Sequence, residues 1–284
     1  MSRVAITGAG GQLGRQLVAA FQGAGHEVWG LTRADYDIAE GSGSQALEAW
    51  EPEVIVNSAA WTDVDGCARQ PDRAMRVNGD APGALARVAA SVGALIVQVS
   101  TNEVFDGSSD RPYLDDDDPS PINAYGRSKL AGERAVIAAE PRHLVVRTAW
   151  LFGPGGSNFV TKILVAAERA RDSGAPLRLV EDEIGNPTWT PDLAHAIVGL
   201  VRDGRTGTVH AAGTPATSRL GWASVALEAA GLAVPVEPVP LASFERASTP
   251  PPRAVLAPSA GVPEMAWEPV TRAYASGLVS AARR

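Results

Sequence analysis

A tyrosine and a lysine lie four residues apart in the stretch NAYGRSKLAGE, residues 123–133. The pattern predicts a helix over residues 124–139, which would place Tyr125 and Lys129 on one face, where both can act on the same ligand. A phenol has a pKa of about 10 and keeps its proton at neutral pH, and a nearby ammonium stabilises the phenolate left after proton donation. The pair is therefore suited to protonating a carbonyl oxygen as that carbonyl is reduced.

A hydroxyl precedes this pair at the end of a predicted strand. The apolar run ALIVQVST, residues 94–101, ends at Ser100 and Thr101. Because the carboxyl end of a parallel strand opens onto the ligand crevice of an α/β sheet, we predict that Thr101 polarises the same carbonyl. A surface tyrosine beside a lysine is the competing interpretation of the four-residue spacing, so the reading depends on what surrounds it.

A glycine-rich turn near the start of the chain supplies that context. In VAITGAGGQLGRQL the glycines follow a predicted strand at residues 3–7 and open a helix at 12–24. Glycine there permits a tight turn and lets backbone N–H groups approach a pyrophosphate at the positive end of the helix. A turn with no ligand is the alternative. The predicted cofactor-binding residues of this turn are Gly8, Gly10, Gly11, Gln12 and Leu13.

The end of the second predicted strand, residues 27–31, indicates which dinucleotide binds. An acidic residue would hold the ribose 2′-hydroxyl of NAD, but the chain has Thr32 and Arg33 at this point. A guanidinium suits a 2′-phosphate, so we predict NADPH, with NADH possible and a solvent-facing Arg33 as the alternative. Asp37 and Ile38 are predicted to flank the adenine.

Strand-like and helix-like segments alternate as far as residue 150, which is typical of a Rossmann-type, doubly wound parallel α/β sheet. We expect a dinucleotide-binding domain over residues 1–150, to which the chain returns at about 189–212. Residues 151–284 are expected to form mostly a smaller C-terminal α/β substrate lobe. Within it, residues 215–284, rich in Pro and Ala, are expected to be helices and loops.

Composition narrows the function further. The 284 residues carry a net charge of −7 and a pI near 5.2, which disfavours a nucleic-acid partner. No apolar run reaches the roughly 18 to 20 residues of a membrane span, and no secretory signal pattern opens the chain, so we expect a cytoplasmic protein. Cys67 is the single cysteine, and the acidic run 115–118 lacks the spacing of a calcium loop, so no metal site is predicted.

Six motifs together resemble the extended short-chain dehydrogenases and, more closely, the dTDP-4-dehydrorhamnose reductase family. They are TGAGGQLG, NSAAWTDVD, STNEVFDG, RPYLDDDDPSPINAYGRSKLAGE, VVRTAWLFGPGGSNF and DEIGNPTWTPDLA, in the order of that family and across nearly the whole length. The resemblance implies NADPH-dependent reduction of the C4 keto group of a dTDP-4-dehydro-6-deoxy sugar, most closely dTDP-4-dehydro-L-rhamnose to dTDP-L-rhamnose. It implies Thr101, Tyr125 and Lys129 as the catalytic residues, with Lys129 also holding the nicotinamide ribose.

The resemblance also assigns residues to the walls of the cleft. Ala59 and Ala60 would line the cofactor groove, and Trp150, Asn158 and Phe159 would face the nucleotide-sugar. Ordinary core packing explains small and aromatic side chains equally well at these positions.

The chain departs from the family pattern at three places. STNEVF replaces the usual STDYVF, so Asn102 and Glu103 are predicted to contact the substrate, where Glu103 would accept from a sugar hydroxyl or pair with an ammonium; facing solvent is the alternative. The arginine that grips the diphosphate would be Arg246 or Arg253, and we predict Arg253. Gln16 replaces a glutamate that bridges metal-dependent dimers in some relatives, so we expect a monomer or weak homodimer.

Three alternatives share these motifs. A reductase of a different dTDP-4-keto sugar would use the same chemistry, and Glu103 keeps this option open. An epimerase or dehydratase would recycle its cofactor without net NADPH consumption. A non-catalytic NADP-binding regulatory subunit would keep the fold and lose turnover.

Overall fold

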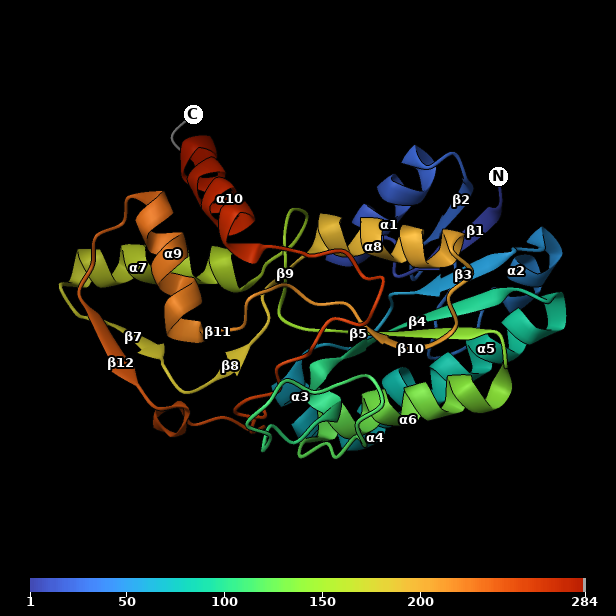
Figure 1. The fold of residues 1–284 in the computed structure, drawn as a ribbon, viewed down its shortest axis with the longest axis horizontal. Helices are drawn as coiled ribbons and strands as arrows, with labels where there is room; N and C mark the ends of the chain where they lie inside the picture. The colour runs from blue at the N-terminus through green and yellow to red at the C-terminus, as the bar shows by residue number, and fades with distance from the viewer. Residues whose placement is uncertain (283–284) are drawn as a thin grey trace.

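A six-stranded parallel sheet forms the centre of the larger lobe in the computed structural model, which describes residues 1–282 (Figure 1). The order across the sheet is β2-β1-β3-β4-β5-β10. The strands are β1 (Arg3–Thr7), β2 (Glu27–Leu31), β3 (Val54–Asn57), β4 (Leu95–Thr101), β5 (His143–Thr148) and β10 (Gly207–His210). Winding reverses between β1 and β3, and ligands of such sheets bind outside the carboxyl ends of the strands at this point. The predicted doubly wound parallel sheet is confirmed.

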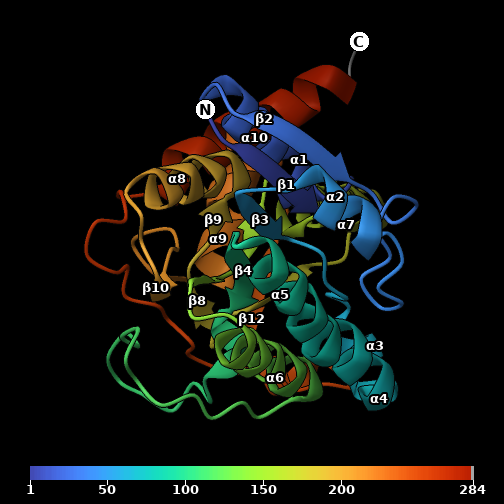
Figure 2. The ribbon, with the colours of Figure 1, turned by 90° about the vertical axis from the view of Figure 1, so that its right-hand side faces the viewer.

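Helices cover both faces of this sheet, as the view in Figure 2 shows. Because both faces are covered, β4 is buried along its whole length, which explains its nearly continuous apolar sequence. Leu17 of one covering helix and Ile197 of another pack against Val4 and Val97 on the first face. That face carries α1 (Gln12–Gly23) and α8 (Thr190–Arg202), and the other carries α2 (Ser44–Trp50), α5 (Ala81–Val92) and α6 (Ala124–Ala139).

The helical stretch over residues 71–92 contains a wider turn. It consists of α4 (Pro71–Ala74), a π-helical segment η1 (Met75–Asp80) and α5, and it follows the short α3 (Val64–Arg69). In the wider segment the Asn78 amide accepts from Trp61 N at 2.8 Å and donates to Trp61 O at 3.0 Å. These two bonds hold the loop after β3 beside the cavity described below, and π-helical turns are frequent at functional sites.

After Thr148 the chain leaves the sheet and later returns to it through α8 and β10. Between these points, and again after β10, it builds a second lobe around the fully buried Trp222. The helices of this lobe are α7 (Phe159–Ser173), α9 (Arg219–Ala230) and α10 (Trp267–Ala282), with a short 3₁₀ turn η3 (Leu241–Ser243). Its short strands pair as β6 (Leu151–Phe152) with β9 (Thr188–Trp189), β7 (Leu177–Val180) with β12 (Val236–Val239), and β8 (Ile184–Gly185) with β11 (Thr217–Ser218).

The strand β12 differs from the expectation of helices and loops after residue 215. Pro235, Pro238 and Pro240 interrupt the strand-like pattern of this segment. The strand forms because it pairs with β7 alone, and prolines are tolerated at the edge of a sheet, where one row of N–H groups has no strand partner.

Polar side chains on three neighbouring strands interrupt the apolar interior of the sheet. The Thr7 hydroxyl donates to Asn57 Oδ1 at 2.6 Å, and Asn57 Nδ2 donates to Gln98 Oε1 at 2.7 Å. All three residues are buried, one on each of β1, β3 and β4. This ladder joins the last residues of β1 and β3 to Gln98 in the middle of β4 and so fixes the relative position of the three strands.

Candidate active site

A cavity of about 440 Å³ lies where the carboxyl ends of the strands meet the second lobe. The segment that follows β1, the end of β4, the start of α6, the chain after β5 and the start of α9 all contribute to its walls. The residues of most chemical interest in it are Gln12, Thr101, Glu103, Tyr125, Lys129 and Arg219. The crevice predicted from the topology therefore contains groups from both lobes.

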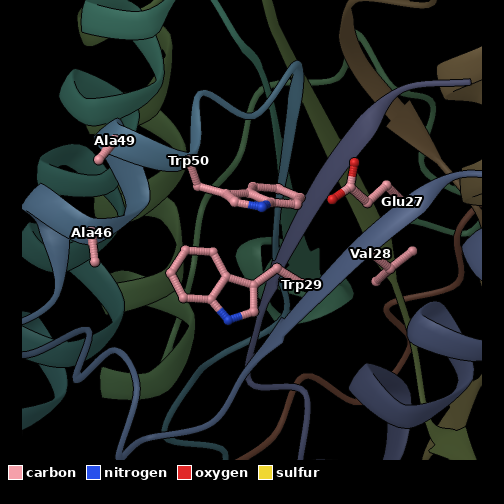
Figure 3. A pocket seen from close by; sticks show the side chains of 6 residues that line it. All are labelled: Glu27, Val28, Trp29, Ala46, Ala49 and Trp50. Atoms are coloured by element: carbon pink, nitrogen blue, oxygen red, sulfur yellow. The ribbon is translucent and has the colours of Figure 1, made fainter.

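A second hollow, of about 530 Å³, lies against the edge strand β2 and shares no lining residue with the first cavity (Figure 3). Trp29 and Trp50 line it with their rings 5.6 Å apart and inclined by 63°. Glu27 is the one titratable residue in its wall. It offers no constellation of acid, base or nucleophile, so we place the chemistry in the first cavity.

The glycine turn brings β1, β3 and α1 into close contact. Gly8 has φ of +71°, and a Cβ at this position would lie 2.8 Å from the backbone nitrogen of Ala59, so a side chain cannot be accommodated. Gly11 is the N-cap of α1, and within residues 1–282 no side chain caps this helix and no acidic residue occupies its first turn. Its first N–H groups are therefore suited to an anionic ligand.

The structure places most of the predicted turn residues at the cavity. Gly11, Gln12 and Leu13 line it, whereas Gly10 is exposed in the turn. Of the two alanines after β3, Ala60 lines the cavity and Ala59 lies against Gly8.

Arg33 is exposed just beyond β2, and no carboxylate of residues 1–282 lies within ion-pairing distance of it. The preceding Thr32 donates its N–H and its hydroxyl to Asp35 at 2.9 and 2.6 Å, and these bonds lower the pKa of the Asp35 carboxyl. Asp37 accepts from Ala39 N at 3.0 Å. Arg33 is thus left available to a ligand, whereas the Asp35 carboxylate is held in a turn by Thr32.

Three predicted catalytic residues meet in one wall of the cavity. Thr101 ends β4, and Tyr125 and Lys129 lie one turn apart at the start of α6. Their exposed fractions are 7%, 8% and 4%. The Lys129 ammonium donates to Val99 O at 2.7 Å, and this bond fixes it beneath the strand end. A hydroxyl, a phenol and an ammonium thus converge on the same space.

Burial shifts the pKa values of Tyr125 and Lys129 in opposite directions, because it disfavours the charged form of each side chain. It raises the pKa of Tyr125 above its ordinary value, and the negative charge of Glu103 acts in the same direction. It lowers the pKa of Lys129 to about 8, an effect that the charge of Glu133 opposes. At neutral pH the phenol therefore carries its proton and the ammonium is largely charged, which is the state that a proton donor with charge compensation requires.

A buried ion pair lies one helical turn beyond Lys129. Arg147 Nη2 and Glu133 Oε2 are 2.9 Å apart, with side chains 6% and 2% exposed. Ser100 donates to the same carboxylate at 2.5 Å. Burial, together with the charge of Arg147, lowers the pKa of the neighbouring His210 to about 4, so this imidazole is neutral at pH 7. The network joins β4, β5 and β10 to the catalytic helix.

Asn123 joins the catalytic helix to Glu103. Its Oδ1 accepts from Gly126 N at 2.7 Å and so caps α6, while its Nδ2 donates to Glu103 Oε2 at 2.7 Å. A Cβ on Gly126 would lie 2.0 Å from Glu103 O, so glycine is required where the helix meets the short 3₁₀ turn η2 (Asn102–Val104). Burial raises the pKa of the Glu103 carboxyl, while Asn123 opposes this shift. Glu103 therefore lines the cavity with one carboxyl oxygen, Oε2, bound to the Asn123 amide.

The neighbouring Asn102 is committed to the backbone of the opposite segment. It is 4% exposed, lines the cavity and donates from Nδ2 to Ala254 O at 2.9 Å. The bond ties the end of β4 to the chain that crosses from the second lobe.

Trp150 marks the junction of the two lobes in a strained conformation. Its φ is +43°, in the left-handed region that bulky residues rarely adopt. The guanidinium of Arg219 lies 3.5 Å from the centroid of its ring, so one face of the indole is covered by a cation. Arg219 is held in turn by Glu183, at 2.8 Å from Nη2. At this wall the arginine, together with the indole, faces the cavity.

Three predicted substrate residues lie outside the cavity wall. Asn158 caps α7 and donates from Nδ2 to Gly153 O at 3.0 Å. Phe159 stacks on Trp222 with ring centroids 4.5 Å apart, in the core of the second lobe. Arg253 donates to Asp110 O at 3.4 Å. Helix capping and core packing thus account for the first two positions.

The glycine turn at a winding reversal, with a hydroxyl, a tyrosine and a lysine around one cavity, defines a Rossmann-type reductase of the extended short-chain dehydrogenase class. The family described as RmlD substrate binding domain matches residues 2–279. The chain belongs to this family, that of the dTDP-4-dehydrorhamnose reductases.

Individual relatives agree with this assignment. The chain is 42% identical over 235 residues to a dTDP-4-dehydrorhamnose reductase of Mycolicibacterium smegmatis, covering 81% of this chain and 69% of that protein. It is 44% identical over 207 residues to a dTDP-4-keto-6-deoxy-D-glucose reductase of Streptomyces niveus, covering 72% and 70%. A crystal structure of the Bacillus anthracis dTDP-4-dehydrorhamnose reductase in complex with NADP has a TM-score of 0.90 and 32% identity, covering 96% of this chain and 98% of that one.

Sequence reasoning missed several residues at the site. Asn123 had a recognisable signal, because an asparagine before a helical pattern is a favoured N-cap. Thr148 and Arg219 had none, because their places in the cavity wall depend on how the chain after β5 and the start of α9 pack.

Three further observations concern membranes, metal ions and the acidic run. Within residues 1–282, no helix is long and apolar enough to span a bilayer. The same residues contain no group of three His, Cys, Asp or Glu side chains arranged to hold a metal ion. In the acidic run, Asp117 pairs with Arg111 at 2.7 Å, and this contact lowers the pKa of the Asp117 carboxyl to about 2.

Proposed function

We propose that the protein reduces the C4 keto group of a dTDP-4-dehydro-6-deoxy sugar with NADPH, most closely dTDP-4-dehydro-L-rhamnose to dTDP-L-rhamnose. The observation that carries this proposal is the convergence of Thr101, Tyr125 and Lys129 on one cavity that also contains the glycine turn. Membership of the reductase family supports the reaction, and the residues of this chain account for its proton transfer.

The Tyr125 phenol is the proton donor in this proposal. As the carbonyl oxygen gains negative charge, the phenol transfers its proton to that oxygen, while the Thr101 hydroxyl donates a hydrogen bond to it. The Lys129 ammonium stabilises the phenolate that remains. Val99 O holds the ammonium in place at 2.7 Å, so little rearrangement is needed during the reaction.

The residues at the crevice fit a dinucleotide. The uncapped first turn of α1 suits a pyrophosphate, and the exposed Arg33 suits a 2′-phosphate. Thr148 Oγ1 is buried in the cavity wall and has no hydrogen-bond partner within residues 1–282, as expected of a group that a ligand satisfies. NADPH, when bound, supplies the hydride for the reduction. Lys129 would also hold the nicotinamide ribose, and Asp37 and Ile38 would flank the adenine.

The substrate is proposed to enter from the side of the second lobe. Glu103 presents a carboxyl group beside Tyr125, where it would accept a hydrogen bond from a sugar hydroxyl. Asn102 and Trp150 line the same region. We assign the sheet lobe, residues 1–150 with 189–212, to the cofactor and the rest mostly to the substrate. The proposal includes a cytoplasmic protein that is a monomer or weak homodimer.

A second candidate is reduction of a different dTDP-4-keto sugar. Glu103 favours it, because a carboxylate in place of the family's tyrosine changes the polar group that meets the sugar. The similarity to a dTDP-4-keto-6-deoxy-D-glucose reductase is consistent with such a substrate.

The decisive experiment measures the loss of NADPH absorbance after the protein is mixed with freshly prepared dTDP-4-dehydro-L-rhamnose. Stoichiometric oxidation with dTDP-L-rhamnose as product is the expected result. Oxidation with dTDP-4-keto-6-deoxy-D-glucose but not with the rhamnose precursor would select the second candidate. Binding of NADPH without oxidation of either substrate would contradict both.

A further inference from the structure

We propose that Arg219 binds the diphosphate of the nucleotide-sugar, an inference that rests on the proposed function for the identity of the ligand. Arg219 is the first residue of α9 and lines the cavity from the second lobe. Neither its neighbours in the sequence nor the resemblance to the family pointed to it.

The guanidinium is held in one orientation. Nε and Nη2 both donate to Glu183 Oε1, at 3.1 and 2.8 Å, and the Glu183 side chain is 7% exposed. The central carbon of the guanidinium, Cζ, lies over the Trp150 ring, 3.5 Å from its centroid. Nε and Nη2 are therefore occupied by the carboxylate, while Nη1 makes no hydrogen bond within residues 1–282. A pre-oriented guanidinium with a free edge is well matched to phosphate oxygens.

The other cations near the cleft either serve Tyr125 or lie outside the cavity wall. Of the residues in the cavity wall, Lys129 and Arg219 are the cationic ones, and Lys129 serves Tyr125. Arg246 lies 3.5 Å from Asp65, and Arg253 donates from Nη2 to Asp110 O at 3.4 Å, while its buried Nε has no partner within residues 1–282. Neither of these predicted candidates lines the cavity. Arg219 thus remains for a ligand group that carries two negative charges.

The carboxylate of Glu183 gives the inference a second consequence. It neutralises part of the charge of Arg219, so replacing it with glutamine should leave the arginine in place with a stronger field toward an anion. If the ion pair only supported the structure, E183Q would instead weaken dTDP binding, because Arg219 would lose the contact that orients it.

The test is the affinity of dTDP, measured by calorimetry for wild type, R219Q, E183Q and the double variant R219Q/E183Q. Loss of a charge-assisted contact should weaken dTDP binding by about 10- to 100-fold in R219Q and in the double variant. E183Q should bind dTDP as tightly as wild type or more tightly. Binding of thymidine, which has no phosphate, should change less than about threefold, the range expected of indirect effects.

Matched controls come from the same chain. R272Q removes an arginine of the same lobe that also pairs with a glutamate but does not line the cavity, and it should change dTDP affinity less than about threefold. R246Q and R253Q are measured beside it, because they remove the two arginines that the sequence offered for the diphosphate. Melting temperature and NADPH affinity confirm that each variant is folded, and the double variant avoids leaving Glu183 buried without its partner. Equal dTDP affinity in wild type and the double variant would overturn the proposal, as would a larger loss in R253Q or R246Q.

A panel of nucleotides separates this proposal from the proposed function. If wild type binds UDP or GDP in place of dTDP, and R219Q loses that binding, then the arginine assignment stands and the dTDP-sugar substrate is wrong. If wild type binds none of the three, both proposals are overturned.

Discussion

The change Glu133→Gln tests how the second turn of α6 supports catalysis. Glu133 lies one turn beyond Lys129, and its charge opposes the fall in the pKa of that lysine to about 8. Replacing the carboxylate with a neutral amide should lower the pKa of Lys129 further. Because the ammonium is needed to stabilise the phenolate of Tyr125, kcat/KM should then begin to fall at a lower pH.

The size of the shift follows from the separation of the two charges. The Cβ atoms of residues one turn apart lie about 6 Å from each other. If the two charges are taken to be separated by the same distance, an effective dielectric of about 20 gives nearly 3 kcal/mol. Arg147, 2.9 Å from the carboxylate, cancels part of this attraction. Taking about half leaves roughly 1.4 kcal/mol, which corresponds to about one pKa unit. The alkaline limb, expected near pH 8 in the wild-type protein, should move to about pH 7.

The assay is the pH dependence of kcat/KM for ketone reduction, with R134Q as the control. Arg134 is the next residue on the helix but is exposed, so its loss should move the limb by less than about 0.3 pH units. Because Glu133→Gln leaves Arg147 without its carboxylate, melting curves at each pH must show that the variant is folded. An alkaline limb that stays in place, or that moves to higher pH, would refute the electrostatic link between Glu133 and Lys129.

Three other changes have defined outcomes. Tyr125→Phe should lower kcat by roughly 10²- to 10⁴-fold with NADPH affinity unchanged, and near-normal turnover would remove the tyrosine from the mechanism. Asn123→Ala should lower the free energy of unfolding by about 1 kcal/mol in urea titrations, since α6 loses its cap; an unchanged midpoint would count against that cap. Arg33→Gln should weaken NADPH binding by about 10- to 100-fold in calorimetry and leave NADH unaffected, whereas equal losses for both cofactors would argue against a 2′-phosphate contact.

The parts of the fold that could be predicted are those in which neighbours along the chain decide the structure. The alternation of apolar strands with amphipathic helices indicated the parallel sheet, and the observed strand order agrees with it. Tyr125 and Lys129 could be paired because both lie on a single helix. Thr101 could be added because strand ends of a parallel sheet meet at one edge.

The parts that could not be predicted depend on contacts between distant segments. Arg219 and Glu183 are 36 residues apart and meet through the packing of the second lobe. Asn158 looked like a substrate residue, yet its amide caps α7, which depends on the local geometry of the turn before that helix. The strand β12 was hidden by its prolines, because pairing at an edge outweighs local propensity.

The most direct test of the central claim is the fate of the hydride. NADPH labelled with deuterium at the transferable C4 position should be oxidised by the protein in the presence of dTDP-4-dehydro-L-rhamnose. The account predicts one deuterium at C4 of the sugar in the product, detected by mass spectrometry and NMR, and strongly reduced incorporation with Tyr125→Phe. An altered sugar that contains no deuterium, formed without net consumption of NADPH, would contradict the account and indicate a cofactor-recycling epimerase or dehydratase.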